Sequence, residues 1–214
     1  MGVWVLVPVK PLLRAKSRLA DVLGQEARAK LAEAMLRRTL HVVLALPQTE
    51  GVLVISRGSH ALAISREMGA NTVQESGAPE LNTALMRATQ VLHGFKAEAV
   101  LILPADIPLI TTDELSEVLA MGTEDQTVVI ATDREADGTN VLLVRPPGVF
   151  EYAYGEGSFQ RHQQLARLAK MEVRIYESER LSLDIDTAED LATYEQYVAD
   201  GTFGATPLVL PGDG

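Results

Sequence analysis

Two carboxylates that stand two residues apart suggest a metal site near the C-terminal end of the chain. They are Asp184 and Asp186, in the segment Leu183-Asp184-Ile185-Asp186-Thr187. Residues i and i+2 of an extended chain point to the same side, so both carboxylates would project together while their apolar neighbours turn into the core. Such a pair suits Mg²⁺, which takes its other ligands from water and substrate phosphates. The alternative is a helix cap only, because Thr187 and Asp190 have the spacing of a capping box.

A third carboxylate follows a buried-type apolar run in the middle of the chain. The run Leu-Ile-Leu at residues 101–103 leads through Pro104-Ala105 to Asp106. If this run is a strand of a parallel sheet, Asp106 lies near the carboxyl end of the sheet, where open α/β folds bind their ligands. Capping of a turn is the other interpretation. Together with Asp184 and Asp186, it would complete a set of three carboxylates from distant segments.

Positive charge is concentrated near the N-terminus, although the chain as a whole is acidic. The apolar run from Trp4 to Val9 leads into residues 10–18, which contain four of the 19 Lys and Arg residues of a chain whose net charge is −10. These four are Lys10, Arg14, Lys16 and Arg18. A first strand that ends in a basic loop before a helix places cations beside backbone N–H groups, as anion sites require. The alternative is a solvated basic turn that balances the acidic surface.

Two further segments contain residues that let the backbone approach a ligand closely. Residues 131–140 end in Asp137-Gly138-Thr139-Asn140, although an Asp-Gly hairpin turn explains this pattern equally well. Residues 154–159, Tyr-Gly-Glu-Gly-Ser-Phe, lead into a helix with Ser158 as the expected N-cap. Two glycines before a helix can form a cradle of N–H groups for a phosphate or carboxylate, and a flexible loop with an ordinary cap is the alternative.

Other polar residues carry weaker signals. Asn82 could contact a base or a ribose, but asparagine is also a good N-cap, and we favour the cap. The histidines lack the close spacing of a metal pair, so we expect surface or packing roles for His41, His60, His93 and His162. Neither Asn82 nor any histidine therefore enters the candidate site.

The composition limits the class of protein. With 214 residues and 47% hydrophobic content, we expect one domain over residues 1–200 and a tail, residues 201–214, rich in Gly, Pro and Thr. The absence of cysteine excludes disulfides, thiolate metal sites and cysteine nucleophiles. A pI near 4.9 argues against a nucleic-acid surface, and no apolar run approaches the ~20 residues of a membrane span. We expect a cytoplasmic protein whose tail is loose or packs on a partner chain, with Pro207 to Leu210 as the segment that could form a homodimer.

Apolar periodicity predicts an α/β domain with a mainly parallel sheet flanked by helices, because short β-rich runs alternate with longer helical ones. The expected strands are residues 3–8, 51–56, 72–74, 99–104, 127–132, 139–144 and 172–176. The expected helices are about residues 25–46, 59–68, 81–94, 111–121, 158–171 and 187–199. The two adjacent strands at 127–132 and 139–144 indicate a local departure from parallel winding.

Five motifs together resemble one known family. They are Pro8-Val9-Lys10 with Ala15 to Leu19, Pro104 to Leu109, Asp137 to Asn140, Gly155-x-Gly157-Ser158-Phe159, and Leu183 to Thr187. In this order and spacing they are similar to the phosphoenolpyruvate and 2-phospho-L-lactate guanylyltransferases of coenzyme F-420 biosynthesis, among the molybdenum-cofactor-guanylyltransferase-like nucleotidyltransferases. The resemblance covers residues 3–198 and implies a Rossmann-like nucleotide-diphospho-sugar transferase fold.

The resemblance also implies roles for individual residues. It implies a Mg²⁺ site formed by Asp106, Asp184 and Asp186. It implies a GTP site in the N-terminal loop with Val9, Lys10, Lys16 and Arg18, of which Lys10 and Lys16 are the catalytic cations. It implies that phosphoenolpyruvate or 2-phospho-L-lactate is held by Thr139, Gly155 and Ser158. At Glu80 the chain departs from the glycine that the family pattern leads us to expect before Leu81-Asn82.

The implied reaction transfers GMP from GTP to the phosphate of the acid and releases pyrophosphate. That phosphate is already ionised near neutral pH, so the reaction needs charge neutralisation rather than a general base. Two alternatives stay open, a metal-dependent sugar-nucleotide glycosyltransferase and a nucleotide-binding protein without turnover. The family resemblance, and no single residue, favours phosphoenolpyruvate over 2-phospho-L-lactate.

Overall fold

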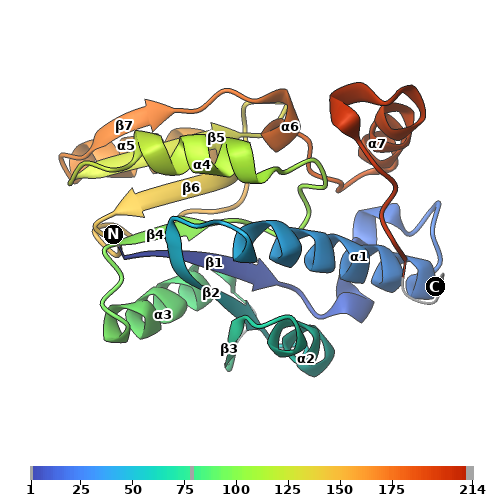
Figure 1. The fold of residues 1–214 in the computed structure, drawn as a ribbon, viewed down its shortest axis with the longest axis horizontal. Helices are drawn as coiled ribbons and strands as arrows, with labels where there is room; N and C mark the ends of the chain where they lie inside the picture. The colour runs from blue at the N-terminus through green and yellow to red at the C-terminus, as the bar shows by residue number, and fades with distance from the viewer. Residues whose placement is uncertain (1, 78–79, 211–214) are drawn as a thin grey trace.

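A seven-stranded sheet with helices on both faces forms the protein (Figure 1); the computed structural model describes residues 2–77 and 80–210. The strands stand in the order β3-β2-β1-β4-β6-β5-β7. Their bounds are β1 Val3–Val9, β2 Thr49–Ser56, β3 Asn71–Gln74, β4 Ala99–Ile102, β5 Thr127–Thr132, β6 Thr139–Arg145 and β7 Glu172–Ile175. Each predicted strand is present with ends within two residues of the prediction, and the α/β fold with a mainly parallel sheet is confirmed.

The helices cover the two faces of the sheet unequally. Their bounds are α1 Gln25–Leu44, α2 Ser59–Glu67, α3 Leu81–Gly94, α4 Thr112–Met121, α5 Ser158–Leu168, α6 Glu179–Ser182 and α7 Ala188–Asp200. Helices α1, α2 and α4 share one buried cluster with the sheet, and α3 and α5 share the other. Helix α5 ends three residues earlier than predicted, before Lys170 takes a left-handed backbone conformation with φ 60°.

Strand β1 shows why the central strands have continuous apolar sequences. Val5 and Val7 pack with the cluster of α1, whereas Trp4 and Leu6 pack with the cluster of α3. Successive side chains of a strand point to opposite faces, and both faces here are covered by helices. A strand in this position must therefore be apolar at every residue.

Strand direction changes at β6, as the adjacent strand pair predicted. Strands β2 and β4 pair with β1 in parallel, whereas β6 is antiparallel to both β4 and β5. The first residues of β6, Thr139 and Asn140, consequently lie at the rim where β1 and β4 end. The connections after β1 and β4 open at the same rim, so residues from distant segments meet there.

The C-terminal segment packs on its own chain as far as it is described. Tyr194 of α7 donates its hydroxyl to the backbone oxygen of Thr206 at 2.7 Å, and the Arg180 guanidinium lies 5.5 Å from the centre of the Phe203 ring. Residues 202–206 therefore contact α6 and α7 of the same chain. Residues 211–214 lie outside the described part, and pairing through Pro207 to Leu210 stays a prediction. Within the described residues, no helix is both long enough and apolar enough to cross a membrane.

Candidate active site

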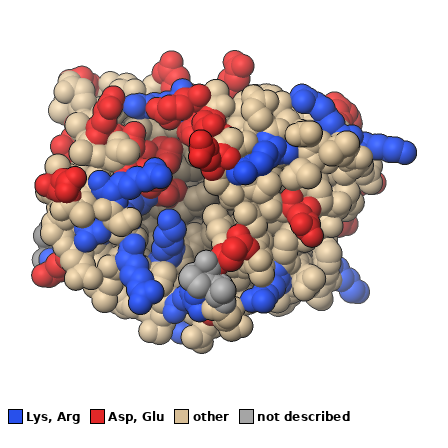
Figure 2. Space-filling view, turned by 180° about the vertical axis from the view of Figure 1, so that it is seen from behind, with Lys and Arg blue, Asp and Glu red and all other residues tan. Residues whose placement is uncertain are grey.

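A cleft of about 890 Å³ lies at the rim where β1 and β4 end. Its walls come from the loops after these strands, the β5–β6 loop, the loop before α5 and the loop before α7. Figure 2, which views the molecule from behind, shows basic and acidic side chains close together around a hollow. Every residue of the predicted site, Val9, Lys10, Lys16, Arg18, Asp106, Thr139, Gly155, Ser158, Asp184 and Asp186, lines this cleft.

Three carboxylates meet on one side of the cleft, as predicted for a metal site. Each of Asp106, Asp184 and Asp186 offers an oxygen, and these oxygens lie within 4.8 Å of one another. The backbone N–H of Ile185 donates to the backbone oxygen of Asp106 at 3.0 Å. This hydrogen bond holds the segment of Asp184 and Asp186 beside the segment of Asp106. Leu183 and Ile185 are fully buried, so the predicted alternation of polar and apolar residues is present.

The capping alternative for this segment is correct, and it does not exclude a metal site. Thr187 and Asp190 form a capping box at the start of α7. Asp190 also accepts from the backbone N–H of Asp186 at 3.1 Å. The cap therefore uses Asp190, which leaves the carboxylates of Asp184 and Asp186 free to face the cleft.

Lys16 lies between the carboxylates instead of facing open cleft. Its ammonium nitrogen is 2.8 Å from Asp106 Oδ2 and 2.9 Å from Asp186 Oδ1, and its side chain is only 7% exposed. Lys16 has a left-handed backbone conformation, φ 53° and ψ 43°, which is uncommon for a residue with a side chain. Burial alone would lower the pKa of Lys16, but the charges of Asp106 and Asp186 outweigh it and raise that pKa. Lys16 is therefore held charged, as the counter-ion of the acidic cluster.

The two carboxylates of the Asp-x-Asp pair have opposite electrostatic environments. Burial, together with the charges of Asp106 and Asp186, raises the pKa of Asp184 to about 7. Burial also acts to raise the pKa of Asp186, but the charge and hydrogen bond of Lys16 outweigh it and the pKa is lowered. The cluster therefore carries more negative charge than Lys16 alone can balance, and one further cation would relieve this.

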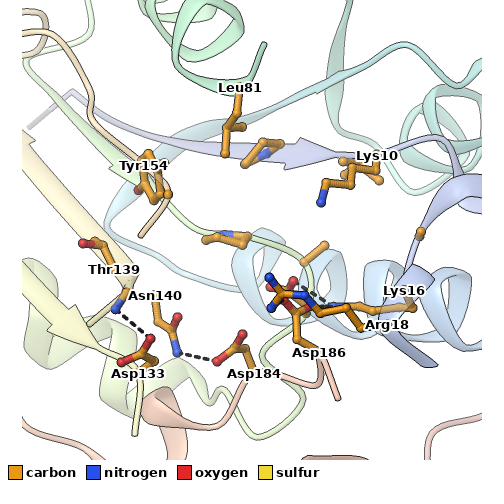
Figure 3. Close-up of a pocket in the computed structure, with 18 of the residues that line it drawn as sticks. Lys10, Lys16, Arg18, Leu81, Asp133, Thr139, Asn140, Tyr154, Asp184 and Asp186 are labelled. Carbon is orange, nitrogen blue, oxygen red and sulfur yellow. Dashed lines mark hydrogen bonds and ion pairs between the residues drawn. The ribbon is translucent and has the colours of Figure 1, made fainter. Parts of the chain in front are cut away.

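The other basic residues of the N-terminal loop are more exposed. Lys10 is exposed at the mouth of the cleft, and Arg18, with a side chain 74% exposed, approaches Asp186 at 3.7 Å. Figure 3 shows Lys10 on the wall opposite Lys16 and Asp186. These side chains are free to move toward an anion in the cleft, whereas Lys16 must first leave two ion pairs.

Asn140 connects the acidic cluster to β6. Its amide nitrogen donates to the backbone oxygen of Leu181 at 2.9 Å and lies 3.4 Å from Asp184 Oδ1 (Figure 3). Its neighbour in the strand, Thr139, is 5% exposed and lines the same cleft. Two consecutive residues of β6 therefore line the cleft, and one of them contacts the acidic cluster.

The loop before α5 has a different cap from the one predicted. Gly157, with φ 68°, occupies the N-cap position, and Ser158 is the first helical residue, so the prediction of Ser158 as the cap is wrong. Asp137 already accepts from the backbone N–H groups of Gly157 and Phe159, each at 2.9 Å. The predicted cradle is thus partly filled by the β5–β6 loop. Gly155, with φ 120°, and Ser158 still line the cleft.

The prediction that Asn82 is a helix cap is wrong. The N-cap of α3 is Glu80, whose carboxylate accepts from the backbone N–H groups of Asn82 and Thr83. The Asn82 side chain instead holds the backbone of Tyr154, accepting from its N–H at 2.8 Å and donating to its oxygen at 3.2 Å. The glutamate in place of the expected glycine explains this, because it takes the capping role and frees the asparagine.

His162 is buried, which agrees with the packing alternative and not the surface one, and its ring also makes two hydrogen bonds. Its Nδ1 lies 2.9 Å from Thr139 Oγ1, and its Nε2 accepts from the backbone N–H of Ala153 at 3.0 Å. One signal in the sequence could have indicated this: His162 follows Ser158 by four residues, which places both on one face of a helix.

Comparison with known proteins decides the family. The family model described as guanylyl transferase CofC like matches residues 3–197. A phosphoenolpyruvate guanylyltransferase of Rubrobacter xylanophilus is 38% identical over 195 residues, which are 91% of this chain and 94% of that protein. A 2-phospho-L-lactate guanylyltransferase of a Methanocaldococcus species is 34% identical over 87% of this chain and 78% of that protein.

The chain belongs to this guanylyl transferase family. The predicted resemblance is confirmed, and the protein is a guanylyltransferase. Solved structures agree on the fold of the enzyme: a nucleotide-diphospho-sugar transferase from Desulfovibrio desulfuricans has a TM-score of 0.78 with 18% identity, and covers 97% of this chain and 93% of its own. A nucleotidyl transferase from Methanothermobacter has a TM-score of 0.68 with 13% identity, and covers 94% of this chain and 99% of its own.

Proposed function

We propose that this guanylyltransferase transfers GMP from GTP to the phosphate of phosphoenolpyruvate, with 2-phospho-L-lactate as the second candidate acceptor. The observation that carries the proposal is the meeting of Lys16 and three carboxylates in the cleft that Thr139, Gly155 and Ser158 also line. A transferase of this kind must bring two anions together, and this cleft has the cations and acidic ligands for that task. The relatives named as phosphoenolpyruvate and 2-phospho-L-lactate guanylyltransferases supply the two acceptors.

A divalent cation, Mg²⁺ by our proposal, would be held by Asp106, Asp184 and Asp186. The donor set fits, because three hard carboxylate oxygens lie within 4.8 Å of one another and Lys16 does not balance all of their charge. When bound, Mg²⁺ would neutralise phosphate charge and hold GTP in alignment. Protonated Asp184 would have to lose its proton to become a ligand.

The chain's own cations would take the rest of the GTP charge. We assign Lys10, Lys16 and Arg18 to the phosphates and the backbone at Val9 to the floor of that site. Lys10 and Arg18 are exposed and can reach an incoming anion directly. Lys16 would exchange its ion pairs with Asp106 and Asp186 for the α- and β-phosphates when a second cation enters the acidic cluster.

The reaction itself forms one bond and breaks one. An oxygen of the acceptor phosphate attacks the α-phosphorus of GTP, the bond from that phosphorus to the α,β-bridging oxygen breaks, and pyrophosphate leaves with the electron pair. No proton needs to be removed, because the acceptor phosphate is ionised at neutral pH. The residues we place on the acceptor, Thr139, Gly155 and Ser158, would hold and orient it so that its phosphate faces the α-phosphorus.

Pyrophosphate release tests the proposal directly. Purified protein would be incubated with GTP and Mg²⁺ in three reactions, with phosphoenolpyruvate, with 2-phospho-L-lactate and without an acceptor. We expect release with phosphoenolpyruvate and none without acceptor. Release with 2-phospho-L-lactate alone would change the acceptor, and no release with either acid would refute both assignments. A matched series with ATP in place of GTP checks the nucleotide.

The two alternative functions have less support. A glycosyltransferase would share the fold and the Asp-x-Asp pair, but the family match over residues 3–197 is to guanylyl transferases. A binding protein without turnover would not need Lys16 and three carboxylates beside one phosphate. Release of pyrophosphate separates both alternatives from the proposed reaction, since neither a glycosyl transfer nor binding alone produces it from GTP.

A further inference from the structure

We propose that His162 is a positioning residue that turns the Thr139 hydroxyl into a fixed hydrogen-bond donor toward the anionic acceptor. The inference rests on the proposed function, because Thr139 is assigned there to the acceptor. His162 itself does not line the cleft; its ring lies behind Thr139, between α5 and the segment that carries Tyr152 and Tyr154. It would therefore act only through the threonine.

The partners of the ring determine where its proton lies. Nε2 of His162 accepts from the backbone N–H of Ala153 at 3.0 Å, so this nitrogen must be unprotonated. A neutral imidazole then carries its only proton on Nδ1, which is 2.9 Å from Thr139 Oγ1. Nδ1 is the donor in this pair, and Thr139 Oγ1 accepts.

The Thr139 hydroxyl has a single proton to donate, and the hydrogen bond from His162 restricts where that proton can point. Because Oγ1 accepts from His162, the hydroxyl proton of Thr139 cannot point at the imidazole and must point elsewhere. Thr139 lines the cleft, and among the described residues its hydroxyl has no partner besides His162, so its proton is available to a ligand there. A donor fixed before binding suits a carboxylate or phosphate oxygen, because no reorientation is required when the anion arrives.

The surroundings of the ring keep it neutral. His162 is fully buried, and the rings of Phe150 and Tyr154 lie 6.5 and 4.8 Å from it between centroids. Burial, and the nearby charge of Arg161, lower the pKa of His162 to about 4. A protonated imidazole would have to abandon the Ala153 amide, which this environment opposes. The tautomer is therefore constant over the range in which the enzyme would work.

The same two hydrogen bonds of His162 connect Thr139 to the loop that we assign to the acceptor. Ala153 precedes Tyr154, whose backbone Asn82 holds, and Thr139 precedes Asn140, whose amide touches Asp184. His162 lies at the junction of these two segments. Its two hydrogen bonds set the distance between Thr139 and the Gly155 loop.

Nitrogen NMR of the wild-type protein tests the tautomer without any substrate. In spectra that correlate ring protons with imidazole nitrogens, protonated and unprotonated nitrogens resonate in separate regions. His162 is assigned by the loss of its signals in His162→Gln. We expect protonated Nδ1 and unprotonated Nε2 at neutral pH. A protonated Nε2, or a charged ring, would overturn the proposal whether or not the protein turns over GTP.

Kinetics test the consequence for the acceptor. His162→Gln should raise the KM for the acceptor roughly tenfold or more, in line with a weakened hydrogen bond to an anion, and change the KM for GTP less than about twofold. His93→Gln is the matched control, because His93 also uses Nε2 in a hydrogen bond to the backbone, here to the oxygen of Pro147, but lies away from the cleft. Equal changes in both KM values for His162→Gln would indicate general damage and refute the positioning role.

Thr139 variants test the same hydrogen bond independently, including the case in which His162→Gln does not fold. Thr139→Ser retains the hydroxyl and should keep the acceptor KM within about threefold, whereas Thr139→Val should raise it as His162→Gln does. Adding His162→Gln to Thr139→Val should cause little further change, since both remove the same interaction. Additive losses, or a normal acceptor KM in Thr139→Val, would contradict the proposal. Failure of the proposed function would instead appear as no turnover by the wild-type protein.

Discussion

The ammonium nitrogen of Lys16 lies 2.8 Å from Asp106 Oδ2, although 90 residues separate the two along the chain. The pair joins the basic loop after β1 to the acidic turn after β4, with Asp186 as the third member. A buried lysine thus takes a cation's position among carboxylates that we assign to a metal. If both assignments hold, the lysine and the metal compete for these oxygens until GTP gives the lysine another partner.

Removal of the lysine should strengthen metal binding while abolishing turnover. In Lys16→Met the competing charge is gone, so we expect Mg²⁺ to bind about tenfold or more tightly; solvent screening at the half-exposed Asp186 limits the gain. Isothermal titration with Mg²⁺ in the absence of nucleotide measures this. Lys10→Met is the control, because Lys10 makes no ion pair with the cluster among the described residues. Weaker binding in Lys16→Met would contradict the competition.

The same variant has a predicted stability effect. Without Lys16 the three carboxylates repel one another at partly buried positions, so Lys16→Met should melt at a lower temperature than wild type when metal is removed with a chelator. Added Mg²⁺ should restore more of the melting temperature in the variant than in wild type. Equal responses to Mg²⁺ would contradict the competition between Lys16 and the cation.

Loss of the Asp186 charge should remove activity and leave the fold. We expect Asp186→Asn to lower turnover by roughly two orders of magnitude or more, because one metal ligand and one partner of Lys16 are lost together. Asp200→Asn, at the far end of α7, should have near-normal turnover. Thermal unfolding of both variants checks that the fold is retained. Near-normal turnover in Asp186→Asn would end the metal assignment at this residue.

The strands, and the carboxylates that follow them, were predictable from the sequence because both depend on which residues are buried. Strands β1 and β4 are apolar at every position because helices cover both faces, and this pattern is visible in the sequence. The three carboxylates were identifiable for the same reason, since each follows a strand or an extended apolar segment at the rim of the sheet. The short α6 was not predicted, because four residues contain no helical period.

Features that depend on single hydrogen bonds were not predictable. The left-handed backbone at Lys16, which lets its side chain reach the acidic cluster, has no signature in a residue other than glycine. Two of the cap assignments missed by one or two residues, at Glu80 instead of Asn82 and at Gly157 instead of Ser158, because several adjacent residues could cap equally well. The pairing of His162 with Thr139 required the position of α5 against β6, which no local pattern contains.

The buried His162 should make the protein less stable in mild acid. Its pKa is lowered from 6.5 to about 4 in the folded state, by burial first and by the nearby Arg161 second. Between these values the unfolded chain binds a proton that the folded chain does not, so stability is lost as pH falls from about 6.5 to about 4. The full effect is about 3 kcal/mol. Denaturant unfolding at intervals over this range, for wild type and His162→Gln, measures it.

The difference in pH-dependent stability between wild type and His162→Gln measures the contribution of His162. Acidic residues titrate in both, so their contribution cancels, and His162→Gln should lose less stability than wild type on going from pH 7 to pH 4. The groups that face the ring, Arg161, Phe150, Tyr154 and Thr139, are unchanged in the variant. Parallel pH profiles for the two proteins would mean that the ring is not held neutral.

Asn82 should affect the acceptor without touching it. Its side chain accepts from and donates to the backbone of Tyr154, directly before Gly155, so Asn82→Ala releases the loop that we assign to the acceptor. We expect the acceptor KM to rise about tenfold, in line with the loss of two hydrogen bonds that order the loop. Steady-state pyrophosphate release at varied acceptor concentration measures this. Gln90→Ala, on the exposed side of the same helix, is the control and should behave as wild type. An unchanged acceptor KM in Asn82→Ala would mean that the loop keeps its position without this clamp, and the assignment of Gly155 to the acceptor would lose its structural support.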